Sequence, residues 1–159
     1  MTAKVVLATQ LLMHPAIIHA PDPDHPGWFT WDLHDPARFN GALGKMIVQP
    51  AGPNRGRVRI FPDHGQSNLG DAVHGGVILT LVDVALFAGG HMAGMTDTDA
   101  VTLDLQTNFI GAGRLGVPLD ADVELLRETG RLVFLRGLVV QSEETVAAFN
   151  GTLRKIRPR

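Results

Sequence analysis

The chain has 159 residues, of which 45% are hydrophobic and 19% are charged, and its formal net charge is -2 at pH 7. This length suits one globular domain, and the apolar content is sufficient for a core, which excludes an intrinsically disordered chain. The slightly acidic balance lacks the basic surface typical of nucleic-acid-binding proteins. We therefore expect no nucleic-acid partner.

The chain contains no cysteine, which excludes disulfides, thiolate metal sites and a cysteine nucleophile. Its only serines, Ser67 and Ser142, do not lie in a Gly-x-Ser-x-Gly motif, which argues against Ser-His-Asp hydrolysis. Polar residues interrupt the apolar runs near the N-terminus, far short of the ~20 apolar residues that span a bilayer. We expect a cytoplasmic protein without a signal peptide or a membrane partner.

The first part of the chain is rich in proline. Residues 2–13 are predicted to form a short helix, and the prolines that follow it predict a linker over residues 14–27. Four side chains of this stretch are of metal-ligating types, but their spacing matches no known metal site and favours a solvated loop: His19, Asp22, Asp24 and His25. We divide the chain into an N-terminal extension and linker, residues 1–36, and one domain, residues 37–159.

The domain begins with one short helix and two strands. Asp35 is a suitable cap and Pro36 suits a first helical position, so a helix is predicted over residues 35–43. Strands are predicted over residues 45–48 and 57–62, on either side of a glycine-rich turn.

Residues 74–93 form the most informative segment. Apolar residues cover nearly all sides of a helix here, so other structure must enclose it. Alternating patterns then predict four consecutive strands, over residues 101–109, 119–126, 132–135 and 146–156. One long helix and about six strands predict an α+β fold, in which an antiparallel sheet wraps around the central helix.

The predicted helix carries one carboxylate, Asp83, in apolar surroundings where a charge is costly unless it is paired or used. At the helix start, Gly75 and Gly76 let a ligand approach backbone N–H groups that lack intrahelical partners. Structural roles are the alternatives. Asp83 could bond a neighbouring backbone group, His74 could cap the helix, and Thr102 could be an ordinary strand residue.

The order of these residues resembles the phenylacetate-degradation (PaaI-like) branch of the 4-hydroxybenzoyl-CoA thioesterase superfamily. The resemblance covers about residues 37–156 and implies a hotdog fold. It rests on Asn68, His74-Gly75-Gly76, Asp83 and the strand that opens Val101-Thr102-Leu103-Asp104. The glycine that usually lies between the asparagine and the histidine is one position early here, at Gly70.

The resemblance implies hydrolysis of an aryl or medium-chain acyl-CoA, with no metal and no cofactor apart from the coenzyme A of the substrate. Asp83 is implied as base or nucleophile, Gly75 as the N–H donor to the thioester carbonyl, and Asn68 as the group that orients substrate or water. His74, Gly76 and Thr102 are implied to bind the substrate. Phe87 and Phe109 are candidate walls for the acyl group.

Gly75 and Asp83 are eight positions apart, which separates them by about 12 Å along a helix. One thioester cannot contact both within one subunit, so a shared reaction requires an antiparallel helix from a symmetry mate. We expect a homodimer or homotetramer. Two alternatives remain: a hotdog dehydratase or hydratase in which His74 and Asp83 exchange protons, and a noncatalytic acyl-CoA-binding module, although the sequence offers no DNA-binding helix-turn-helix.

Overall fold

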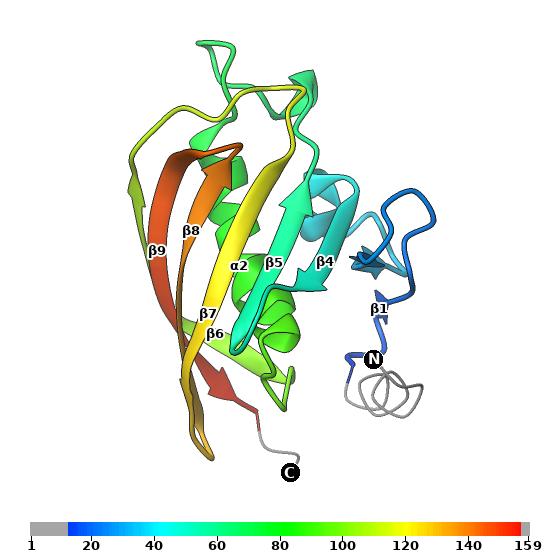
Figure 1. The fold of residues 1–159 in the computed structure, drawn as a ribbon, viewed down its shortest axis with the longest axis vertical. Coiled ribbons are helices and arrows are strands. Elements are labelled where there is room, and N and C mark those ends of the chain that lie inside the picture. The colour runs from blue at the N-terminus through cyan, green and yellow to red at the C-terminus, as the bar shows by residue number, and fades with distance from the viewer. Residues whose placement is uncertain (1–12, 157–159) are drawn as a thin grey trace.

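The structure is a computed structural model that describes residues 13–156. One long helix, α2 (Gly75–Met92), lies against a seven-stranded antiparallel sheet (Figure 1). Across the sheet the strands follow the order β2 (Phe29–Thr30), β4 (Met46–Pro50), β5 (Arg55–Ile60), β7 (Leu119–Glu128), β8 (Leu132–Gln141), β9 (Glu144–Lys155) and β6 (Ala100–Phe109). The predicted α+β hotdog fold is confirmed.

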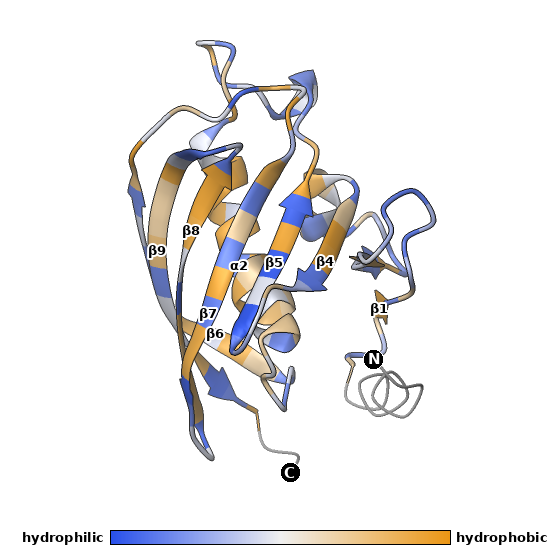
Figure 2. Ribbon diagram, viewed as in Figure 1, coloured by the Kyte–Doolittle hydropathy of each residue, from blue (hydrophilic) through white to orange (hydrophobic). Residues whose placement is uncertain are grey.

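Hydrophobic and hydrophilic residues alternate along β5, as the colour bands of Figure 2 show, and successive side chains of a strand point to opposite faces of the sheet. In β5, Val58 and Ile60 are fully buried. The intervening Arg59 lies on the outer face, where its Nη2 donates to Asp120 Oδ2 of β7 at 2.7 Å. A register slip of one residue would expose the apolar set and bury this ion pair, so the pairing of β5 with β7 is well specified.

The central helix is only partly enclosed, because 56% of its residues are buried while Leu79 stays exposed. α2 is long and apolar enough to cross a membrane by length and composition alone, but here its buried side packs on the sheet. Its buried residues include Ile78, Leu81, Val82, Ala85, Leu86 and Ala88. Near its end the helix approaches the sheet closely, because a side chain at Gly89 would collide with Val123 of β7. Residues 2–12 of the predicted N-terminal helix lie outside the described residues.

The predicted helix over residues 35–43 is wrong. A single 3-10 helix, η1 (Phe39–Leu43), occupies the end of this range. Asp35 Oδ1 accepts a hydrogen bond from Ala37 N at 3.1 Å, as a cap would, but the chain then only turns. Asn40 and Gly41 are poor helix formers, and the apolar pattern is too short to offset their cost.

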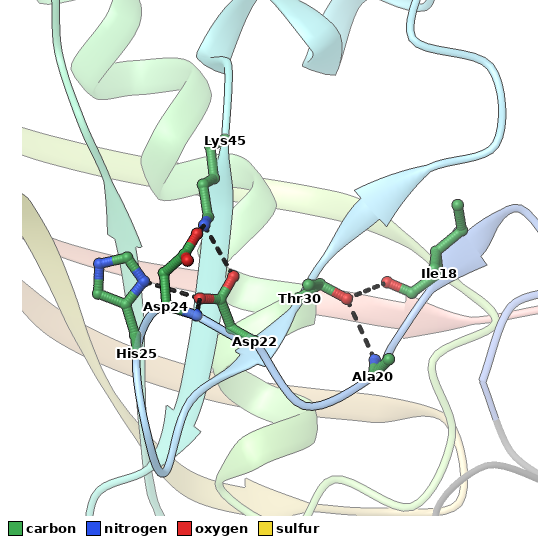
Figure 3. A network of polar contacts seen from close by, with 7 residues as sticks. All are labelled: Ile18, Ala20, Asp22, Asp24, His25, Thr30 and Lys45. Atoms are coloured by element: carbon green, nitrogen blue, oxygen red, sulfur yellow. Dashed lines mark hydrogen bonds and ion pairs between the residues drawn. The ribbon is translucent and has the colours of Figure 1, made fainter.

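Residues 14–27 are largely exposed, but parts of the stretch are fixed to the domain, so its interpretation as a solvated loop is wrong for Asp22, which is buried. β1 (Ile17–Ile18) pairs with β3 (Asp32–Leu33), and β2 joins the main sheet beside β4. The Asp22 side chain is 1% exposed and contacts Lys45 Nζ at 2.9 Å and His25 Nδ1 at 2.8 Å (Figure 3). Lys45 holds the pKa of Asp22 down at about 2, with His25 adding to the effect. The domain boundary at residue 37 stays a prediction.

Candidate active site

The start of α2 presents one unused backbone donor. His74 is the N-cap, and its Nδ1 accepts a hydrogen bond from Gly76 N at 2.8 Å. Within the part of the chain that the structure describes, the N–H of Gly75 donates to no group. A helix N-terminus favours negative charge, so this N–H can bind a carbonyl oxygen that becomes an oxyanion.

Asn68 lies in the loop that leads to this helix, after the 3-10 helix η2 (His64–Gln66). Its Oδ1 accepts from Gly70 N at 2.8 Å and from Ala72 N at 3.1 Å, which folds the loop tightly. His74 N donates to Gln66 O at 2.8 Å and holds the loop against the helix start. Since Oδ1 is used by the loop, the amide NH2 of Asn68 is the part that can face a ligand.

Asp83 receives a hydrogen bond from the next strand. Thr102 Oγ1 of β6 donates to Asp83 Oδ1 at 2.7 Å. Strict alternation along β6 predicts Thr102 on the face opposite Leu105, but a bulge between Thr102 and Asp104 shifts the register against β9. Because a bulge re-aims the residues before it, Thr102 points at the helix together with Leu105.

The candidate residues thus form two groups. Asn68, His74 and Gly75 lie at the helix start, where the ring of Phe109 approaches Gly75 closely enough to contact a side chain placed there. Asp83 and Thr102 lie two turns further on, about 12 Å along the helix axis from Gly75. The structure brings each group together but does not join the two within one chain.

A cavity of about 370 Å³ opens beside Asp83. Most of its lining is apolar or aromatic: Met13, Ile17, Trp31, Val84, Phe87, Ala100 and Ile156. Phe87 lines this cavity and Phe109 does not, and the role of either residue as a wall for the acyl group stays a prediction. Sequence reasoning missed Ile17 and Trp31, although Phe29 and Trp31 lie two residues apart around Thr30, a spacing that indicates a strand with one face on a core.

Titratable groups also cluster at the end of α2. His91 is buried against Trp31 and His19, with ring-centroid distances of 5.8 Å and 6.2 Å. Burial, reinforced by repulsion from His19, lowers the pKa of His91 to about 4. No group of three or more His, Asp or Glu side chains in residues 13–156 is placed to hold a metal ion.

Comparison with known proteins identifies the family. The sequence model of the thioesterase superfamily matches residues 70–148, which include Gly75, Asp83 and Thr102. The chain belongs to the thioesterase superfamily. It is accordingly a thioester hydrolase with a PaaI-like hotdog fold. A comparison with curated protein sequences finds no significant match.

Solved structures agree with the fold. A mutant of the phenylacetic acid degradation protein PaaI from Thermus thermophilus is similar with a TM-score of 0.64 and 25% identity, over 77% of this chain and 100% of that one. PaaI from the E. coli phenylacetic acid degradation operon gives 0.63 and 21%, over 74% and 83%. The protein smu.793 from Streptococcus mutans, bound to acetyl-CoA, gives 0.60 and 23%, over 70% and 90%.

Proposed function

We propose that this thioester hydrolase acts on aryl or medium-chain acyl-CoA substrates in the cytoplasm, with no metal and no cofactor beyond the coenzyme A of the substrate. The observation that carries the proposal is the Asp83 carboxylate, held by Thr102 at the mouth of an apolar cavity. The acetyl-CoA bound to the structurally similar smu.793 protein supports the substrate class.

In the proposed reaction, Asp83 removes a proton from water, whose oxygen attacks the thioester carbonyl; direct attack by the carboxylate is the alternative. The Gly75 N–H stabilises the oxyanion while the C–O bond forms. The oxyanion then collapses, the C–S bond breaks, and the thiolate of coenzyme A leaves. Because this thiolate is a good leaving group, no strong general acid is required.

Gly75 and Asp83 are separated by about 12 Å, so one thioester can contact both only if one of them comes from a second subunit. β6 is an edge strand of ten residues whose outer side pairs with no strand in residues 13–156. It leaves large apolar side chains exposed at and beside this edge: Val101, Leu103, Phe109 and Ile110. A long apolar edge strand is a template for pairing with another chain, which supports a dimer through β6.

The position of the site residues along β6 supports one register of this pairing. Thr102 lies beside Asp83, and Phe109 lies beside Gly75. A two-fold axis through Gln106 would pair residues that share one face of β6 with each other across the interface. When the extra residue of the bulge is left out of the count, Phe109 of the partner subunit lies opposite Thr102. Asp83 would then face the helix start of its partner, completing two composite sites. Such dimers could pair further into tetramers.

The hydratase alternative has less support. It requires His74 to exchange protons with the substrate close to Asp83. The His74 Nδ1 instead accepts the Gly76 N–H and caps the helix.

The experiment is a free-thiol assay on a panel of acyl-CoA thioesters with the wild type, Asp83→Asn and the control Glu143→Gln, an exposed carboxylate in the turn before β9. Asp83→Asn should lower kcat by about 10²–10⁴, as loss of a general base does. Glu143→Gln should match the wild type. Unchanged turnover by Asp83→Asn, or hydration without thiol release, would overturn the proposal.

A further inference from the structure

Part of the lining of the cavity beside Asp83 comes from residues outside the matched family region. α2 contributes Asp83, Val84 and Phe87, and the N-terminal segment contributes a wall of Met13, Ile17 and Trp31. The family model begins at residue 70, so Met13, Ile17 and Trp31 all lie before the matched region. The family match therefore assigns no role to this wall.

The wall is held in place by backbone and side-chain bonds. Trp31 is 7% exposed, and its backbone N–H donates to Met46 O of β4 at 3.1 Å. Ile17 pairs with Leu33, and Thr30 Oγ1 both donates to Ile18 O and accepts from Ala20 N (Figure 3).

The ion pair of Asp22 with Lys45 fastens the same segment to the start of β4. Trp31 and Ile17 are thus fixed walls rather than parts of a loose arm.

The hydrophobic side chains of the lining favour an apolar acyl group. Asp83 faces the cavity, and the polar lining residues are His14, Asn40, Asp83, Thr98 and Asp99, while Ile17, Trp31 and Phe87 are hydrophobic. A charged acyl tail buried against these three side chains would lose its hydration without a partner, whereas an alkyl or phenyl group gains by burial. The volume lies within the about 300–1,000 Å³ that is typical of small-molecule sites.

We propose that residues 13–31 form the acyl-selecting wall of the active site, with Ile17 and Trp31 setting the size of an apolar aryl or medium-chain acyl group. This inference rests on the proposed function, since it takes Asp83 as the point where the thioester carbonyl lies. The short acetyl group leaves the wall uncontacted, so selectivity should appear as a preference for longer acyl groups.

Two neighbouring residues provide the test. Ile17 lines the cavity, whereas Ile18 is 39% exposed and points the other way along β1. Ile17→Phe should lower kcat/KM for phenylacetyl-CoA and octanoyl-CoA by about tenfold or more relative to acetyl-CoA, because a hydrophobic pocket discriminates by this order for small changes of size. Ile18→Phe should leave the ratio unchanged.

If Ile17→Phe does not fold, Ile17→Ala replaces it and should shift the preference toward dodecanoyl-CoA through the enlarged cavity. Equal acyl-CoA ratios in the wild type and the folded Ile17 variant would overturn the acyl-wall proposal while leaving hydrolysis intact. Failure of the wild type to release thiol from any acyl-CoA would instead overturn the proposed function. The two failures are therefore distinguishable.

Discussion

Thr102 donates a hydrogen bond of 2.7 Å to the carboxylate of Asp83, across the gap between the edge strand and the central helix. The contact depends on the bulge in β6, which turns Thr102 toward the helix. The hydroxyl binds Oδ1 of Asp83 and does not bind Oδ2. The bond therefore orients Asp83 for its proposed reaction with water or with the thioester.

The first prediction concerns this hydrogen bond. Thr102→Val keeps the shape of the side chain but removes the hydroxyl donor, so kcat should fall by about tenfold, less than for Asp83→Asn. Thr102→Ser retains the donor and should restore most of the turnover. Since Thr102 is exposed in the single chain, its loss should change the free energy of unfolding of that chain by less than about 0.5 kcal/mol.

Steady-state kinetics and chemical denaturation measure the two quantities separately. Equal kcat for Thr102→Val and the wild type would show that the hydroxyl has no positioning role.

The second prediction concerns the dimer register. The chain has no cysteine, so a single introduced thiol reports without background. An axis through Gln106 brings the two copies of this residue within the about 4.4–6.8 Å that a disulfide requires, so Gln106→Cys should form a covalent dimer under mild oxidation. Asn108→Cys, on the same face, should not, because its two copies would lie about 13 Å apart along the strands.

Non-reducing electrophoresis gives the readout. A cross-link at position 108 in preference to position 106 would contradict the register, and a monomeric wild type in light scattering would contradict the dimer itself.

The third prediction concerns pH. His91 has a folded-state pKa of about 4, below its value of about 6.5 in an unfolded chain, because it is buried with neither ring nitrogen bonded in residues 13–156. The unfolded state therefore binds more protons between these two values, and stability falls as the pH drops from about 6.5 to about 4. The loss from this group should be about 2–3 kcal/mol.

His91→Phe should remove this part of the pH dependence, whereas replacement of the exposed His34 by Phe should not. The free energy of unfolding at pH 7.5 and pH 4.5 measures both. If the free energy of unfolding changed equally with pH in His91→Phe and the wild type, His91 would not be the source of this pH dependence.

Most of the sheet and the helix could be predicted because their signals are local. α2 is apolar on nearly all sides, and apolar and polar residues alternate along β6 and the first part of β7. The structure of the N-terminal segment could not be predicted, because its strands have two residues each and contacts with distant parts of the chain hold it in place. Asp22 meets Lys45, and His19 meets His91, across stretches of sequence that no local pattern links.

The same contrast holds for the site. Asp83, Gly75 and Asn68 were predicted from a motif, and the structure places them on the helix and the loop before it, although their roles stay predictions. The bulge that turns Thr102 toward the helix arises in the pairing of β6 with β9, which no local pattern in β6 predicts. Ile17 and Trp31 lie more than 50 residues before Asp83 in the sequence, and all three line one cavity. Tertiary packing alone brings them together, so no local pattern predicts this wall.

The central claim is that Asp83 and Gly75 from different subunits serve one thioester, and mixed dimers test it. Gly75 is the first helical residue after an N-cap with φ -62° and ψ 137°, a conformation that accepts a following proline. Gly75→Pro therefore removes the N–H without breaking the helix, and Gly75→Ala is the matched control that keeps the N–H.

Asp83→Asn and Gly75→Pro homodimers should each be nearly inactive in the free-thiol assay. After unfolding and refolding together in equal amounts, the mixture should recover about a quarter of wild-type turnover, since half the dimers carry one intact site of two. Recovery of no activity in heterodimers that are shown to form, or near-normal turnover by Asp83→Asn alone, would contradict the composite site.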